Sequence, residues 1–365
     1  MCKELKATPE KGEKRSLPRS RRDAKSNLVK ARFDKSSRPH RPEAIPFQRG
    51  KSPRRFPGSD SRRTEWISPA VWFALNRAGT DAHRAASGSN WWLERFGSDL
   101  LLSYQQDRDC GAVLAEAGQR CGAYGYDPAR IFGKHLPREA SERNAPVLLR
   151  GDSAIALETE VSEAGLRYGI DFAAGYSAGL FIDQRANRAR LREERPRRLL
   201  NTFSYTCSFS VAAASAGAET VSIDLSRRSL IRGEENFRRN GIDPAGGHRF
   251  IADDVFAILP RLAKRGEKFD AIILDPPTFS RNQSGVAFQV RRDFGRLMAL
   301  ALEVAAPGAK ILLSVNCSEM RVSDLEQEGR AALRTQKRPG RFSRTAPLPD
   351  FPPGAGAKTV WMEVG

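Results

Sequence analysis

The chain has 365 residues, of which 40% are hydrophobic and 28% are charged, and its formal net charge is +18. This length is typical of about two domains, and the apolar fraction suffices for a packed core, which excludes a wholly disordered chain. No apolar run reaches the roughly 18 residues of a membrane-spanning helix, and the first 20 residues lack the apolar stretch of a secretory signal. We therefore expect neither a membrane span nor a secretory leader.

The five cysteines indicate a reducing compartment. Their number is odd, none of them forms a C-x-x-C pair, and only four histidines are available to complete a metal site. A disulfide framework and a structural zinc site are both disfavoured by this pattern. The sequence therefore predicts a cytoplasmic protein without a bound metal.

The first 65 residues concentrate the positive charge. They contain 20 basic and 8 acidic residues, a net +12, together with seven prolines and almost no periodic apolar pattern. Such a segment buries too little apolar surface to offset its ordering entropy, which predicts a disordered basic arm over 1–65. A polycation attracts phosphate backbones without reading sequence. Two interpretations stay open, an arm that holds RNA and a solvated extension without a function.

Residues 66–178 predict a small α+β accessory domain, which would contribute to RNA binding. The stretch 68–78 has the pattern of a helix. Alternating polar and apolar residues then indicate short strands at Val147–Leu149, Ala156–Glu158 and Leu166–Ile170.

From Arg197 onward, apolar strands alternate with helical segments. This alternation predicts a doubly wound α/β fold with a mostly parallel sheet, covered by helices on both faces. The final strand, 358–364, is expected to close an antiparallel hairpin at the edge of the sheet. The other expected strands are 197–205, 219–225, 248–254, 269–277 and 309–317, with helices at 209–218, 229–241, 255–267 and 291–308.

Carboxylates follow the second and third expected strands of this sheet, where open α/β folds bind their ligands. Asp224 suits the two hydroxyls of a ribose, because one carboxylate can accept two hydrogen bonds. Asp254 can accept a hydrogen bond from an adenine amino group. Both residues have a plain structural alternative, as N-caps of the helices that begin near Ser226 and Val255.

The string Asp275-Pro276-Pro277-Thr278-Phe279 is the most specific short motif of the chain. Two prolines fix the backbone directly after a buried strand and prevent a helix from continuing there. The carboxylate of Asp275 can then meet a flat substrate, with Phe279 available to stack on it. A purely structural turn is the alternative interpretation.

Taken in order, five strings resemble those of class I S-adenosylmethionine-dependent methyltransferases. The similarity is specifically to bacterial enzymes that methylate cytosine C5 or guanine N7 of large-subunit ribosomal RNA. It is strong over residues 179–320 and weak over 145–178. The matching strings are Gly179-Leu180-Phe181-Ile182-Asp183-Gln184-Arg185, Leu200-Asn201-Thr202-Phe203-Ser204-Tyr205-Thr206, Val221-Ser222-Ile223-Asp224-Leu225-Ser226, Glu235-Asn236-Phe237-Arg238-Arg239-Asn240-Gly241 and Asp275-Pro276-Pro277-Thr278-Phe279.

The resemblance implies a seven-stranded Rossmann-like methyltransferase domain over 179–365, with S-adenosylmethionine as cofactor and RNA as partner. Arg185 would face the methionine carboxylate of the cofactor, and Asp224 would bind its ribose. Asp275 would lie between the cofactor and the target base. The implied cofactor contacts are Asp183, Gln184, Arg185, Phe203, Ser204, Tyr205, Thr206, Asp224, Leu225, Asp254 and Asp275, and the expected substrate contacts are Pro276, Pro277, Phe279 and Arg281.

One departure from the family pattern concerns the loop after the first strand. The family usually has a glycine pair where this chain has Cys207 and Ser208. Glycines there allow a close approach of backbone to ligand and unusual φ angles. An RNA-binding relative that has lost catalysis therefore stays an alternative, whereas a dinucleotide oxidoreductase is disfavoured because no G-x-G-x-x-G follows that strand.

Cys317 bears on the type of methyl transfer. Cytosine C5 is a poor nucleophile until a thiolate adds to C6, after which a base must remove the C5 proton. The cytosine-C5 branch of the family is similar here, with a cysteine before a serine at the end of this strand, whereas the guanine branch has an asparagine-rich string. In this chain Asn316 precedes Cys317, so two roles stay open for the Cys317 thiol, that of the nucleophile and that of a buried packing residue. Asp275 is the candidate proton acceptor, or it only orients the base.

Arg281, Arg291 and Arg292 follow the Asp275 motif. They are expected either to hold phosphates around a target base that has left its stack, or to form a solvated helix face.

Overall fold

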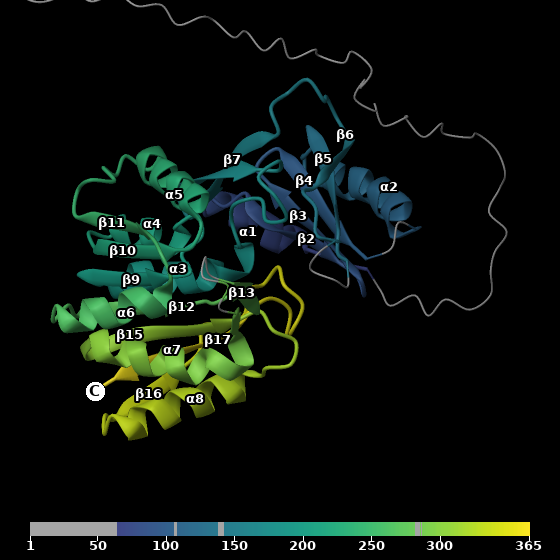
Figure 1. The fold of residues 1–365 in the computed structure, drawn as a ribbon. Coiled ribbons are helices and arrows are strands. Elements are labelled where there is room, and N and C mark those ends of the chain that lie inside the picture. Colours follow the sequence, from purple (N-terminus) through teal and green to yellow (C-terminus); the bar gives the residue numbers. More distant parts are fainter. Residues whose placement is uncertain (1–63, 106–107, 138–141, 282–284, 286) are drawn as a thin grey trace, which may run out of the picture. The chain divides into compact units, whose positions relative to one another are not determined.

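The computed structural model describes residues 64–365 except 106–107, 138–141, 282–284 and 286 (Figure 1). Nearly all of the predicted basic arm, 1–65, lies outside the described residues, so its disorder and its role stay predictions. Contacts join the described residues into a single unit, Asp60–Gly365. The division of this unit near residue 178 likewise stays a prediction.

A six-stranded sheet of order β1-β2-β3-β4-β5-β6 forms the first part of this unit. Its neighbours are antiparallel except for β4 and β5, which run parallel because the α2 helix connects them. Leu100 and Leu102 of β4 pack with the residues of α1 and α2, and Leu101 packs on the opposite face. The elements are β1 (Glu65–Trp66), α1 (Pro69–Arg77), β2 (Ala82–Ser87), β3 (Trp91–Phe96), β4 (Asp99–Tyr104), α2 (Arg108–Ala123), β5 (Arg130–His135) and β6 (Val147–Arg150).

A two-stranded hairpin, β7 (Glu158–Glu163) and β8 (Leu166–Asp171), follows this sheet. Its turn residues Ala164 and Gly165 both have positive φ, which is the geometry that suits a tight hairpin. The hairpin packs against helix α5 (Arg227–Arg239), since Gly169 N donates to Asn236 Oδ1 at 2.8 Å. A strand is expected at Ala156–Glu158, whereas β7 begins only at Glu158.

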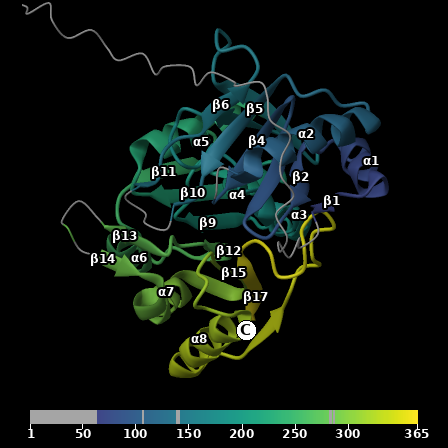
Figure 2. The same cartoon turned by 90° about the vertical axis from the view of Figure 1, so that its right-hand side faces the viewer.

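The second sheet has seven strands in the order β11-β10-β9-β12-β15-β17-β16 (Figures 1 and 2). The first five are mutually parallel, whereas β17 runs antiparallel to β15 and to β16. The predicted doubly wound, mostly parallel fold and its closing hairpin are therefore confirmed. The strands are β9 (Arg198–Thr202), β10 (Glu219–Asp224), β11 (His248–Ala252), β12 (Phe269–Leu274), β15 (Ala305–Val315), β16 (Gly340–Ser343) and β17 (Lys358–Val364).

Alternation along each strand distributes apolar side chains to both faces of this sheet. Leu200 and Ile272 pack with α6, α7 and α8, whereas Leu199 and Ile273 pack with α3 and α4 on the other face (Figure 2). Such double burial explains the near-continuous apolar runs of the strands. The remaining helices are η2 (Ile182–Gln184), α3 (Arg185–Glu194), α4 (Ser208–Ala214), α6 (Val255–Lys264), α7 (Val290–Val304) and α8 (Val322–Thr335).

Several elements were not among those expected, including α2, α3 and α8 and the strands β2, β3 and β5. Helix α8 covers the sheet before β16, and a small hairpin of β13 (Phe279–Arg281) and β14 (Ala287–Gln289) follows the Asp-Pro-Pro motif. Over the part of the chain that the structure describes, no helix is both long and apolar enough to cross a bilayer. Nor do three or more histidine, cysteine or acidic side chains gather there as a metal site would require.

Candidate active site

The carboxyl ends of four parallel strands form the edge at which the predicted site residues gather. In the register of the sheet, Thr202 at the end of β9 lies between Ile223 of β10 and Leu274 of β12, and Leu274 lies opposite Leu313 of β15. The last residues of these strands and the residues that follow them therefore share one edge. They are the Phe203–Cys207 loop, Asp224, Asp275 and the Asn316–Cys317 segment.

The loop after β9 has an unusual backbone. Phe203, Tyr205 and Cys207 adopt left-handed φ angles of 51°, 48° and 59°, a conformation that costs a non-glycine residue about 1–2 kcal/mol. Hydrogen bonds hold the loop in place, from Ser204 N to Ile223 O at 3.0 Å and from the Tyr205 hydroxyl to Ser177 O at 2.6 Å. Glycine adopts a left-handed angle such as that at 207 without strain, which agrees with the glycine that the family resemblance implies there.

Cys207 is accommodated by a glycine on the neighbouring helix. Its thiol is fully buried, and a Cβ placed on Gly233 of α5 would lie 2.5 Å from its Sγ. Burial raises the pKa of the Cys207 thiol to about 12, so the side chain packs rather than reacts. A thiol at 207 and a glycine at 233 therefore form a complementary pair.

This pairing predicts a coupling between the two positions. Gly233→Ala alone should destabilise the fold by about 1–3 kcal/mol, because the new methyl group overlaps Sγ. In a Cys207→Gly background the same change should cost close to nothing, since the overlap is gone and alanine favours a helix. Urea unfolding of the four chains measures the coupling. Equal costs of Gly233→Ala in both backgrounds would show that the two residues are independent.

Asp224 is held by two backbone amides. Its carboxylate accepts from Tyr205 N and from Ser226 N, each at 2.8 Å, and burial raises its pKa. The N-cap of α5 is Ser226, whose Oγ accepts from Ser229 N, so Asp224 is not the cap. Each carboxylate oxygen accepts one of the two amides and has a further lone pair available, which fits the diol of a ribose.

Asp254 caps a helix, which is the structural role given above as the alternative to cofactor binding. It is the N-cap of α6, and its side chain accepts from Phe256 N at 2.9 Å. Its contact with an adenine amino group stays a prediction.

The side chains of the Asp183-Gln184-Arg185 segment all have hydrogen-bond partners within the protein. Arg185 forms an ion pair with the fully buried carboxylate of Asp350 and donates to Ala82 O. A buried guanidinium requires such a partner, and Asp350 provides it. That Arg185 faces the methionine carboxylate of the cofactor stays a prediction.

Gln184 is 2% exposed and turns its amide toward Asp275. A cofactor contact by this side chain stays a prediction. Asp183 accepts a hydrogen bond from Ala357 N at 2.9 Å. Gly356 allows this approach, since a Cβ there would lie 3.0 Å from the Cβ of Asp183. Burial raises the pKa of Asp183.

Asp275 has the environment of a proton acceptor. Burial raises its pKa to about 6, and the nearby Asp183 carboxylate acts in the same direction. Hydrogen bonds from Ser314 and Gln184 oppose this shift. Of the following residues, Pro276 is buried, whereas Pro277 and Phe279 are exposed at the rim, where a substrate can reach them.

The raised pKa predicts how stability depends on pH. The folded chain holds a proton at Asp275 more tightly than the unfolded chain, in which aspartates have a pKa near 3.8. Protonated Asp275 therefore adds fully to the free energy of unfolding below pH 3.8, and this contribution is lost as the pH rises through about 6. Asp275→Asn removes that dependence. The stability of the variant relative to wild type should therefore rise by up to about 3 kcal/mol between pH 4 and pH 7. Urea unfolding at both pH values measures it, and a constant difference would contradict the assignment.

Cys317 lies just beyond β15 and is 5% exposed. The segment that carries it is fixed from two sides, because Thr278 Oγ1 donates to Asn316 O at 2.9 Å and Lys358 Nζ donates to Cys317 O. The Asp-Pro-Pro motif and the last strand therefore both position the thiol.

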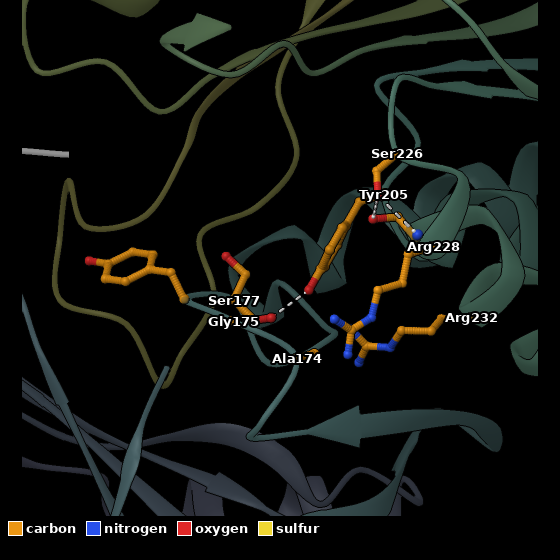
Figure 3. Close-up of a pocket in the computed structure, with 9 residues that line it drawn as sticks. Ala174, Gly175, Ser177, Tyr205, Ser226, Arg228 and Arg232 are labelled. Carbon is orange, nitrogen blue, oxygen red and sulfur yellow. Dashed lines mark hydrogen bonds between the residues drawn. The ribbon is translucent and has the colours of Figure 1, made fainter. Parts of the chain in front are cut away.

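A pocket of about 160 Å³ lies beside the loop after β9 (Figure 3). Tyr205 lies on one side of it, and Arg228 and Arg232 of α5 extend side by side toward it. Arg232 donates to Ala178 O at 2.7 Å, and Arg228 is 3.9 Å from Asp171. The volume is below the roughly 300 Å³ at which small-molecule sites begin, so it fits only one group of a larger ligand.

The three arginines after the motif differ in their partners. Arg281 lies over the ring of Phe279 at 5.7 Å. Arg291 pairs with Glu319 at 2.7 Å, and Arg292 pairs with the adjacent Asp293. Phosphate binding by these residues stays a prediction.

Comparison with known proteins decides the family. Residues 129–363 match the family of S-adenosylmethionine-dependent methyltransferases. The chain belongs to this family. Among its relatives are proteins named ribosomal RNA large subunit methyltransferase I, from Erwinia tasmaniensis (34% identical over 275 residues, 70% of this chain) and Serratia proteamaculans (32% over 274 residues, 70% of this chain). The match spans 66% of the length of each relative.

Solved structures share the fold. A methyltransferase complexed with SAH aligns with a TM-score of 0.69 at 24% identity, over 81% of this chain and 79% of its own. A SAM-dependent methyltransferase from Agrobacterium tumefaciens aligns with a TM-score of 0.61 at 21% identity, over 78% of this chain and 90% of its own. These similarities agree with the seven-stranded sheet described above. S-adenosylmethionine is accordingly the cofactor of the family.

Proposed function

We propose that the protein methylates a base of large-subunit ribosomal RNA, and that the target atom is C5 of a cytosine. The names of the relatives support the RNA class. The observation that carries the cytosine assignment is that Cys317 and Asp275 follow two adjacent parallel strands, on the edge that also holds Asp224. A thiol and a carboxylate are the two groups that C5 methylation requires of the enzyme.

The residues of the edge fit the cofactor. Asp224 would bind the ribose hydroxyls, and the left-handed loop from Phe203 to Cys207 would pass beneath the sulfonium, where its backbone can approach a ligand closely. When bound, S-adenosylmethionine supplies an electrophilic methyl group. The proposed contacts at this edge also include Leu225 and Asp254.

Cys317 would act as the nucleophile. Its thiolate forms a bond to C6 of the cytosine, and the electron pair of the C5–C6 double bond then makes C5 nucleophilic. The methyl group would pass to C5 with S-adenosylhomocysteine as the leaving group. Asp275 then accepts the C5 proton, the double bond re-forms, and the bond from sulfur to C6 breaks to return the Cys317 thiolate. A carboxylate with a pKa near 6 is ionised at neutral pH and is still basic enough for this step.

The rim beside Asp275 would hold the substrate. Phe279 is 50% exposed, so the exposed part of its ring can stack on a base, and Arg281, which lies over that ring, can reach a phosphate. The target base must leave its stack to reach the thiol. We also propose the cytoplasm as the location, as the cysteine pattern predicts.

Product analysis tests this proposal. The full chain is incubated with S-adenosylmethionine and unmodified large-subunit ribosomal RNA, and the digested RNA is examined by mass spectrometry. We expect 5-methylcytidine in an amount that increases with the enzyme concentration. N7-methylguanosine would instead support the guanine alternative, and no methylated base with a folded, cofactor-binding chain would support a relative that only binds RNA.

A further inference from the structure

A chain of buried polar side chains connects the C-terminal strand with Asp275. Its first member is Trp361 of β17, whose Nε1 donates to Asn187 Oδ1 at 2.9 Å. Thr345 Oγ1 donates to the same oxygen at 3.0 Å. Asn187 Nδ2 donates to Gln184 Oε1 at 2.8 Å, and Gln184 Nε2 donates to Ser314 Oγ at 2.8 Å and to Asp275 Oδ2 at 3.3 Å.

The direction of every bond in this chain is set at its first member. An indole N–H can only donate, so the amide atom of Asn187 that faces Trp361 must be its oxygen. The amide nitrogen of Asn187 must then face Gln184, which leaves the oxygen of Gln184 as acceptor and turns its NH₂ group toward Asp275.

Ser314 completes the connection. Its hydroxyl oxygen accepts from Gln184, so its proton is available for the hydrogen bond that it donates to Asp275. Asp275 therefore receives donors from two neighbours. Asn187, Gln184 and Trp361 are at most 2% exposed and Ser314 is fully buried, so water does not compete for these bonds.

We propose that Asn187 is a positioning residue, which orients Gln184 and Ser314 so that both donate to Asp275 and keep it an ionised proton acceptor. What Asp275 does in turnover rests on the proposed function, whereas the orientation rests on the hydrogen bonds alone. Two further charged groups bear on Asp275, since Asp183 of η2 raises its pKa and Arg188 of α3 lowers it. The donors counteract burial and the neighbouring carboxylate.

Asn187→Asp should reverse the direction of the hydrogen bonds between residue 187 and Asp275. Aspartate offers only acceptors when ionised, so Gln184 would turn its NH₂ toward residue 187 and its carbonyl toward Ser314. The Ser314 proton would then be drawn away from Asp275, which loses both donors. We expect the midpoint of the Asp275 titration to move upward by about one pH unit or more.

The readout is the ¹³C chemical shift of aspartate carboxyls in the labelled full chain, followed from pH 4 to pH 8. Asp275→Asn assigns the signal in the wild-type and variant backgrounds. Asn187→Leu serves as an uncharged second variant, which removes the orienting amide and should move the midpoint upward as well. Ser314→Ala, which deletes one donor directly, is the positive control. Thr345→Val is the matched negative control, because Trp361 still orients Asn187.

An upward shift in Asn187→Asp or Asn187→Leu, with an unchanged midpoint in Thr345→Val, supports the proposal. An Asp275 midpoint equal to that of wild type in every folded Asn187 variant, while Ser314→Ala moves it, would overturn the proposal and leave Asn187 a packing residue. The titration needs neither RNA nor turnover. Failure of the methylation assay with a shifted midpoint would therefore count against the proposed function alone.

Discussion

Replacement of Cys317 by alanine is expected to lower the rate of methyl transfer to RNA by about 10⁴-fold or more, as removal of a covalent nucleophile does elsewhere. Without the thiolate, C5 keeps too little electron density to accept a methyl group. The residue is nearly buried and its backbone is held by Lys358, so alanine should preserve the fold. Transfer of a radiolabelled methyl group to ribosomal RNA gives the rate.

The control for this variant is Cys121→Ala. Cys121 is also a buried cysteine, but it lies on α2, which packs on the first sheet, whereas the candidate site lies on the second sheet. Its loss should leave the rate unchanged. If Cys317→Ala kept a tenth of the wild-type rate, the thiol would be a packing residue and the guanine alternative would gain support.

Loss of the Asp224 carboxylate is expected to weaken S-adenosylmethionine binding by about 100-fold or more. Two charge-assisted hydrogen bonds to the ribose would disappear, each contributing about 1.5–3 kcal/mol. Isothermal titration of wild type and Asp224→Ala measures the difference. Because Asp224 also accepts from Tyr205 N and Ser226 N, Asp224→Asn is the second variant, which retains acceptors for these amides but loses the charge.

Asp254→Asn is the matched control for this measurement. Asp254 also follows a strand of the sheet and caps α6 through its side-chain oxygen, a bond that asparagine can keep. Because asparagine also keeps an oxygen that can accept from the adenine amino group, Asp254→Asn should weaken binding less than Asp224→Ala. Unchanged affinity in both Asp224 variants would show that the ribose lies elsewhere.

The residues at the strand ends could be placed from the sequence because a parallel sheet brings its carboxyl ends together whatever the details of packing. Asp224 is the last residue of an apolar strand, Asp275 and Cys317 each follow one, and all three strands belong to the same sheet. The strand and helix alternation likewise fixed the order of the elements. Helix α8 was not predicted, since no element was expected between Cys317 and the closing strand.

The partners of the Asp183–Arg185 segment could not be predicted in the same way. Arg185 pairs with Asp350, 165 positions later, and Asp183 accepts from Ala357, 174 positions later. Both partners come from the irregular stretch between β16 and β17, where no periodic pattern indicates position. Lys358, at the start of β17, directly follows this stretch and donates to Cys317 O. Only the tertiary fold shows that this stretch completes the site.

The Cys207 and Gly233 pair is a second case. Cysteine in place of a family glycine suggests a damaged loop when the sequence is considered alone. The structure shows that the adjacent helix leaves room for the thiol, so the loop keeps its left-handed backbone. The sequence around residue 207 shows the cysteine but not the glycine that makes room for it, because Cys207 and Gly233 are neighbours only in space.

Trapping of the covalent intermediate tests the central claim most directly. The full chain is incubated with S-adenosylmethionine and ribosomal RNA that contains 5-fluorocytosine, whose fluorine cannot leave as a proton does, and the adduct is digested and sequenced by mass spectrometry. We predict an RNA-linked peptide attached through Cys317, absent in Cys317→Ala. Methylated RNA without any such adduct, or attachment through another residue, would contradict the account.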